Sequence, residues 1–107
     1  IEDDTSNTLG VRIHNINTEM YVMKAIPTGY KATHVEVYAS STLINGVDIF
    51  GFNQTTGATS SKGTGNTNAT IDITDVTSGA DVNICIKVSP AVATILIYGA
   101  DITITAV

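Results

Sequence analysis

The chain of 107 residues has a net charge of −5 at pH 7, and 43% of its residues are hydrophobic. This length corresponds to one ordinary domain, which can bury roughly two-thirds of the surface that its unfolded chain would expose. Ten acidic residues against five basic ones would repel a phosphate backbone, so we expect no nucleic-acid partner.

The residue types favour strands over helices. Valine, isoleucine and threonine make up 41 residues, whereas leucine occurs only three times. Their branched Cβ atoms suit a pleated strand better than a crowded helix surface. No run approaches the roughly 20 apolar residues that span a bilayer, and the sequence from Ile1 lacks a basic segment followed by an apolar one. We therefore expect a soluble protein without a membrane partner or a retained secretory signal.

The first residues differ from the rest of the chain. Residues 1–8, "IEDDTSNT", are acidic and polar without apolar alternation, which indicates an N-terminal arm or linker. Residues 9–107 are expected to form one domain. Its first strand is predicted from an inward-facing set, Leu9, Val11 and Ile13. A second apolar run covers residues 20–26, and Pro27 and Gly29 then end it.

The clearest strand pattern follows in "YKATHVEVYA", residues 30–39. Period-two spacing separates an apolar face from a polar one. The apolar face is predicted to carry Val35, Val37 and Ala39, and the polar face His34, Glu36 and Tyr38. We expect this polar row to be a solvated or subunit-facing side of a sheet.

A hairpin is predicted at Asn45-Gly46, because both residues accept the positive φ of a type I′ turn. The strand that follows, "VDIFGFN", has apolar residues on both faces, Val47 and Ile49 against Phe50 and Phe52. Such a strand is expected to be buried on two sides or to be covered by a neighbour.

The second half of the chain begins with residues 54–67, which are nearly all glycine, serine, threonine and asparagine and indicate a long mobile loop. Alternation resumes at Ile71 and Ile73. The next strand is predicted to bury Val82, Ile84, Ile86 and Val88. After Pro90, "TILIY" is expected to form another strand, and "ADITITAV" ends the chain with an aligned apolar set, Ile102, Ile104 and Ala106.

Seven to eight short strands, separated by turn residues and without a helical period, predict an all-β fold. The expected architecture is an antiparallel β-sandwich of jelly-roll or immunoglobulin-like type. Residues 84 and 104 are both expected in its core.

A metal site is the sharpest chemical hypothesis for the polar row. His14, His34 and Glu36 could form a facial site of two histidines and one carboxylate if their strands were adjacent. Spacing that merely permits a site does not make one, so we favour a polar surface. Asp72, Asp75 and Asp81 are likewise read as surface aspartates, because their spacing fits no EF-hand loop.

Other candidate sites also have simpler explanations. "GATSSKGT", residues 57–64, matches only part of the phosphate-binding-loop pattern. The pattern needs a glycine before the lysine, whereas Lys62 precedes Gly63, and no helix is predicted to follow. Cys85 lies between isoleucines and is expected to be a packed thiol rather than a nucleophile. The sequons at Asn53 and Asn68 are expected by chance in a threonine-rich chain. Exposed tyrosines, Tyr30, Tyr38 and Tyr98, could stack on a sugar.

No acid, base and nucleophile set is visible in the sequence. We therefore predict that the protein is not an enzyme and has no catalytic residues, cofactor or bound metal. The remaining classes are structural proteins and binding modules.

Three stretches carry a resemblance to known proteins: "IPTGYKATHVEVYAS", "SKGTGNTNATIDITDV" and "IYGADITI". Together they resemble segments of small β-rich virion structural proteins of tailed phages of marine bacteria, especially cyanophages. The resemblance covers most of the chain from residue 26 to residue 104.

The resemblance implies localisation in a virion and a structural role, with capsid decoration favoured over a tail, fibre or appendage position. The implied partners are other virion proteins, namely the major capsid protein or tail proteins, and further copies of the chain in a homo-oligomer. The polar arm at residues 1–8 and the loop at residues 54–67 are expected to order against such neighbours. A carbohydrate-binding or adhesin module remains the alternative.

Overall fold

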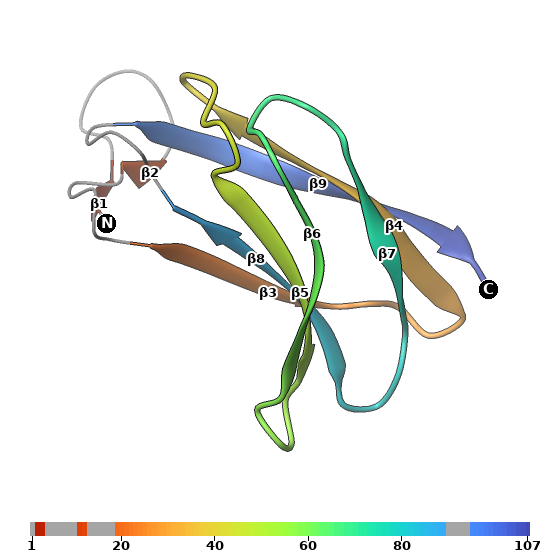
Figure 1. Cartoon of the computed structure of the whole chain (residues 1–107). Coiled ribbons are helices and arrows are strands. Elements are labelled where there is room, and N and C mark those ends of the chain that lie inside the picture. The colour runs from red at the N-terminus through yellow and green to blue at the C-terminus, as the bar shows by residue number, and fades with distance from the viewer. Residues whose placement is uncertain (1, 4–10, 13–18, 90–94) are drawn as a thin grey trace.

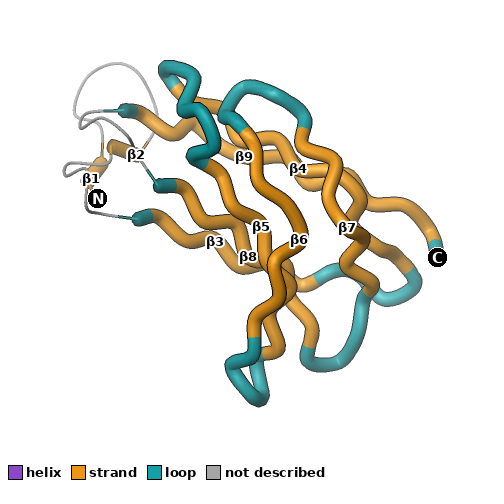
Figure 2. The backbone as a smooth tube through the Cα atoms, viewed as in Figure 1, coloured by secondary structure: helices purple, strands orange, loops and turns teal. Residues whose placement is uncertain are grey.

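A computed structural model of the chain describes residues 2–3, 11–12, 19–89 and 95–107. These residues form nine β-strands and contain no helix (Figures 1 and 2). The described residues therefore include no helix that could cross a membrane. The strands are β1 (Glu2–Asp3), β2 (Val11–Arg12), β3 (Met20–Ala25), β4 (Tyr30–Ala39), β5 (Val47–Asn53), β6 (Thr59–Gly65), β7 (Ile71–Thr77), β8 (Val82–Val88) and β9 (Leu96–Ala106). Of the predicted arm, only β1 lies within the described residues.

The strands form two antiparallel sheets that pack as a sandwich, which confirms the predicted fold class. Sheet A has the order β1-β2-β9-β4-β7, and sheet B has the order β3-β8-β5-β6. Strands β6 and β7, the last strands of the two sheets, lie side by side and close one side of the sandwich (Figures 1 and 2). The opposite side is bordered by β3 of sheet B and β9 of sheet A.

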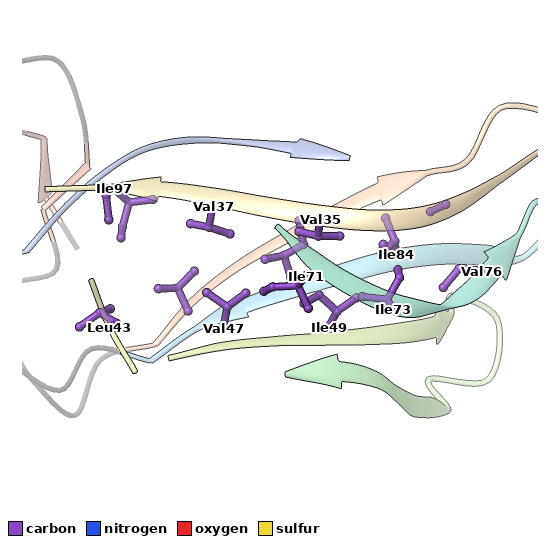
Figure 3. Close-up of a cluster of buried hydrophobic side chains, with 14 of the residues drawn as sticks. Val35, Val37, Leu43, Val47, Ile49, Ile71, Ile73, Val76, Ile84 and Ile97 are labelled. Carbon is purple, nitrogen blue, oxygen red and sulfur yellow. The ribbon is translucent and has the colours of Figure 1, made fainter. Parts of the chain in front are cut away.

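The core lies between the inner faces of the two sheets (Figure 3). β-branched side chains fill it, as the composition predicts. Its largest fully buried apolar side chains are Val35, Val37, Val47, Ile49, Ile84, Ile86 and Val88. The predicted apolar faces of β4, β7 and β8 are therefore confirmed, although Val82 of β8 is only partly buried.

β4 shows how the pattern adapts to the sheet. Val35 and Val37 alternate inward as predicted, but Ala32 is also buried although it precedes Val35 by three positions. A β-bulge at Thr33 explains this, because Ala32 pairs with Ile104 while the next paired residue is His34. Because Thr33 is an extra, unpaired residue, the side chains of Ala32 and Val35 both point into the core.

The predicted hairpin at Asn45-Gly46 is wrong. The two residues do form a turn, in which the Gly46 N–H donates to the Leu43 carbonyl at 3.4 Å. This turn connects β4 of sheet A with β5 of sheet B rather than two paired strands. Asn45 has a positive φ of 53°, whereas a Cβ on Gly46 would lie 2.6 Å from the Leu43 Cβ. Glycine is thus needed at position 46 for close packing against a buried leucine.

The predicted mobile loop at residues 54–67 is also wrong, because it contains β6, which pairs with β5. β6 lacks apolar alternation because isoleucines of β7 pack against its glycines. A Cβ on Gly65 would lie 2.6 Å from Ile71 Cγ1, and one on Gly63 would lie 3.1 Å from Ile73 Cγ2. The neighbouring sheet thus supplies the apolar side chains at this edge.

Two further differences concern the C-terminal strand. The two strands predicted at "TILIY" and "ADITITAV" are one continuous strand, β9. Its apolar set is not fully buried, since Ile102 is half-buried and Ile104 is 39% exposed. The expectation that Ile104 lies in the core is therefore wrong, because β9 borders the sandwich where sheet B does not cover it.

Candidate functional site

The polar row of His34, Glu36 and Tyr38 lies on the outer face of sheet A. Residues between them, Val35 and Val37, point into the core, so the alternation places the row outside. Glu36 is paired directly with Asp101 of β9, which brings two carboxylates onto neighbouring strands. This surface is accordingly polar and acidic.

Hydroxyl groups on the same face donate to these two carboxylates. The Tyr38 hydroxyl donates to Asp101 Oδ2 at 2.8 Å, and the Thr70 hydroxyl donates to Glu36 Oε1 at 2.9 Å. The hydrogen bond to Asp101 raises the pKa of Tyr38 above its ordinary value, because the ionised phenol would lose it. The tyrosine thereby holds the Asp101 side chain over β4.

The residues considered as a hypothetical metal site do not assemble within the described residues. His34 Nε2 lies 3.7 Å from Asp72 Oδ1, but no group of three or more His, Cys, Asp or Glu side chains gathers in the described ranges. His14 lies outside those ranges. Asp75 instead pairs with Lys31 at 2.8 Å. The aspartates singled out in the sequence are therefore separate surface groups where the structure describes them.

Both sequon asparagines have structural contacts. Asn68 has a φ of 60°, and its side-chain amide donates to the Ala39 carbonyl at 3.1 Å while its Oδ1 accepts from the Ala39 N–H at 2.9 Å. The Asn53 Oδ1 accepts the N–H groups of Thr55 and Thr56 in the β5–β6 turn. Both asparagines therefore have a structural role, because their side chains form hydrogen bonds with the backbone in or beside turns.

An apolar strip crosses the outer face of sheet B. We define it as Tyr21, Met23, Phe50, Phe52 and Cys85. Met23 of β3 lies opposite Cys85 of β8, which in turn lies opposite Phe50 of β5. Tyr21 and Met23 are 53% and 55% exposed, and the strip borders a shallow hollow. Exposed apolar side chains gathered on one face are common at interaction surfaces, so the strip is a candidate for one.

Cys85 is the buried centre of this strip. It is packed as predicted, and burial raises the pKa of its thiol above the ordinary value. Its register partners Met23 and Phe50 place it on the outer face of β8, opposite to Ile84 and Ile86, which enter the core. The thiol therefore faces the side chains of the strip rather than the core.

A cluster of charges lies at one end of the apolar strip. Lys87 Nζ lies 3.3 Å from Glu19 Oε2, 3.8 Å from Asp48 Oδ2 and 5.9 Å from the centroid of the Phe50 ring. Glu19 also accepts a hydrogen bond from the Tyr21 hydroxyl at 3.0 Å. This bond, followed by that from Lys87, lowers the pKa of Glu19. The strip therefore combines an apolar centre with a polar rim, as protein interfaces do.

A second apolar feature, the open groove, runs between β3 and β9. It encloses about 400 Å³. Its walls include Met20, Val22 and Lys24 from β3 and Tyr98, Ala100 and Ile102 from β9. The inner side chains of these two strands stay partly exposed because the sheets do not meet on this side.

The sequence alone predicted neither the apolar strip nor the open groove. The two-faced pattern of "VDIFGFN" predicted a strand buried on both sides or covered by a neighbour, and the structure instead leaves Phe50 and Phe52 half-buried at the surface. The signal for the apolar strip was the unbroken apolar run at residues 20–23, whose outer members are Tyr21 and Met23.

No protein-family model matches the chain, and neither a curated protein nor a solved structure matches it.

Proposed function

We propose that the protein is a structural component of a phage virion, a capsid decoration protein that binds a neighbouring virion subunit through the apolar strip. The observation that carries the proposal is the exposure of Tyr21 and Met23 beside Phe50 on one face of sheet B. The resemblance of three sequence stretches to small virion proteins supplies the biological setting.

The chemistry of the strip suits a protein partner. Aromatic residues and methionine are enriched at protein interfaces, and methionine adapts to irregular surfaces. The neighbouring Glu19, Lys87 and Asp48 can orient a partner at the rim, where charges affect specificity more than affinity. On a shell with many equivalent sites, a modest contact of this kind is repeated with each copy.

The test is addition of the purified protein to virions that lack it. We expect saturable binding, which Met23→Lys should weaken at least tenfold because it places a charge in the centre of the strip. Thr74→Lys is the matched control, since Thr74 is exposed on β7 of the other sheet and the change in net charge is the same. Cryo-electron microscopy of the decorated particle would distinguish a capsid position from a tail or fibre position.

Lack of binding to any virion component would contradict the proposal, as would equal binding by Met23→Lys and the wild type. Catalysis is not part of the proposed function. Turnover of a peptide or polysaccharide by the purified protein would contradict that part of the proposal.

A carbohydrate-binding module is the second candidate, favoured by the exposed tyrosines with adjacent carboxylates. Tyr38 lies beside Asp101, and Tyr21 lies beside Glu19. A ring that stacks on a sugar next to a hydrogen-bonding carboxylate is a plausible glycan contact. Saturable binding on a glycan array that is lost in Tyr38→Ala or Tyr21→Ala would favour this function over virion attachment.

A further inference from the structure

β9 is a long strand, and within the described residues most of one of its edges has no partner. On one side it pairs with β4 from Tyr30↔Ala106 to Ala39↔Ile97. On its other side the described residues supply a partner only at Leu96 and Ile97, which pair with β2. From residue 98 to residue 106, nothing in the described part of the chain pairs with this second edge.

The backbone groups on this edge can be assigned from the hydrogen bonds on the opposite side. The Val107 N–H donates to the Gly29 carbonyl at 2.9 Å, and Lys31 pairs with Thr105 in the same register. Antiparallel strands direct alternate residues to alternate sides. The N–H and C=O groups of Ala100, Ile102 and Ile104 therefore point to the unpaired edge.

This edge lacks the usual protection against pairing. Natural edge strands carry charged side chains, above all lysine, or proline, which discourage another strand from pairing. Residues 98–107 contain no lysine, arginine or proline, and their one charged residue is Asp101. Its carboxylate accepts the Tyr38 hydroxyl and is thus directed over β4, away from the edge. By contrast, edge strands β3 and β6 carry Lys24 and Lys62.

We propose that β9 of one molecule pairs with β9 of a second copy, antiparallel and centred on Ile102, to form a two-fold dimer with a continuous sheet A. This register pairs Ala100 with Ile104 of the second copy and overlaps the strands from Gly99 to Thr105. Each backbone group assigned to the edge would then meet a complementary one. A two-fold contact is self-complementary in this way because the same patch serves both molecules.

Side-chain chemistry favours a second copy in this register. On the inner face, Ile102 would meet Ile102 of the second copy, which covers apolar groups that the open groove leaves exposed. On the outer face, Asp101 would lie opposite Thr103 of the second copy, an uncharged residue that does not repel it. A register centred on Asp101 would place two carboxylates opposite each other, which is unfavourable. Avoidance of opposed carboxylates thus favours the alignment centred on Ile102.

The test is sedimentation velocity of the full chain over increasing concentration, with amide hydrogen exchange measured by NMR at both ends of the range. We expect a monomer–dimer equilibrium that Ala100→Lys weakens at least tenfold. Ala100 is exposed, so the variant should fold, and its circular dichroism spectrum checks this. Thr74→Lys on β7 is the control with the same charge and should dimerise like the wild type.

Hydrogen exchange provides the residue-level result. The amides of Ala100, Ile102 and Ile104 should exchange fast in the monomer and slowly in the dimer, whereas Thr103 and Thr105 should be protected in both. A protein that stays monomeric to about 1 mM would overturn the proposal. Protection of Ile102 in the monomer would overturn it too, since the chain itself would then cover the edge.

The dimer goes beyond the proposed virion function and uses β9 rather than the apolar strip. Failure to dimerise would therefore leave binding to virions through Met23 untouched. Conversely, a dimer without virion binding would contradict only the proposed function.

Discussion

The side-chain oxygen of Thr67 lies 2.8 Å from the backbone nitrogen of Leu43 and accepts its hydrogen. The same hydroxyl donates to the Ser41 carbonyl at 2.9 Å. Thr67 is 1% exposed, so these bonds are shielded from water, and they connect the loop before β7 with the crossover from sheet A to sheet B. One buried threonine thus connects the two loops at this end of the sandwich.

We predict that Thr67→Val lowers the free energy of unfolding by about 1 to 3 kcal/mol. Valine has nearly the same shape but leaves the buried Leu43 N–H without its acceptor, and an unsatisfied buried group costs its desolvation. Urea unfolding followed by circular dichroism measures the effect. Thr74→Val is the control, because Thr74 is exposed. Equal stability of the two variants would show that water replaces the hydroxyl.

Gly65→Ala should destabilise the protein by about 1 to 3 kcal/mol, because its Cβ would lie 2.6 Å from Ile71 Cγ1 and force the core to shift. Gly99→Ala is the matched control in β9, where nothing lies within 4 Å of the added atom. Thermal or urea unfolding should therefore separate the two variants.

A double mutant tests the cause of that loss. Adding Ile71→Ala removes Cγ1 and Cδ1, the two atoms nearest to the added Cβ, so Gly65→Ala should cost less in that background than in the wild type. Equal costs in both backgrounds would mean that the lost stability comes from the β6 backbone and not from contact with Ile71.

The two isoleucines expected in the core should differ in their contribution to stability. Ile84 is 0% exposed, so Ile84→Ala should cost about 2 to 5 kcal/mol through lost burial and a residual cavity. Ile104 is 39% exposed, and Ile104→Ala should cost less than about 1.5 kcal/mol when measured in dilute, monomeric protein. Similar costs for both would contradict the open side of the sandwich.

Glu19 should titrate below its ordinary pKa of 4.5, chiefly because it accepts the Tyr21 hydroxyl and secondly because of Lys87. Tyr21→Phe removes the first donor, so NMR titration of the Glu19 carboxyl should show a higher pKa in that variant. A carboxyl group with a lowered folded-state pKa stabilises the fold above its unfolded pKa and loses this contribution as the pH falls through the folded value. The contribution should therefore disappear on acidification below pH 4.5.

Glu19→Gln is the corresponding stability test. Its unfolding midpoint should depend less on pH in the acid range than that of the wild type, while Tyr21→Phe should show an intermediate dependence. An unchanged acid dependence in both variants would contradict the hydrogen bonds assigned to Glu19.

Local spacing is sufficient to predict the strands whose inner faces form the core. Val35 and Val37 in β4, and Ile84 and Ile86 in β8, alternate with outward residues and are buried. A period of two places every second side chain on one face, so a strand with one buried face is visible in its own residues. The same alternation placed His34, Glu36 and Tyr38 on the outer face of sheet A.

β6 could not be predicted in this way, because its residues are polar or glycine. Gly63 and Gly65 are explained only by Ile73 and Ile71, which reach them from the neighbouring strand of the other sheet. The turn at Asn45-Gly46 is similar. Its residues specify a local bend, but the packing of Leu43 in the core directs the chain to the second sheet.

The open edge of β9 and the apolar strip on sheet B both depend on the order of strands in the sheets. "DITIT" shows the same alternation whether its strand is central or at an edge, since backbone pairing leaves no mark on side-chain spacing. In the part of the chain that the structure describes, the mostly unpaired edge of β9 follows from its place between β4 and the short β2. Met23 is likewise exposed, and Phe50 only half-buried, because none of the described strands forms a third layer over sheet B. Residue spacing reports which side chains share a face, and only the packing of the two sheets decides which of those faces meets water.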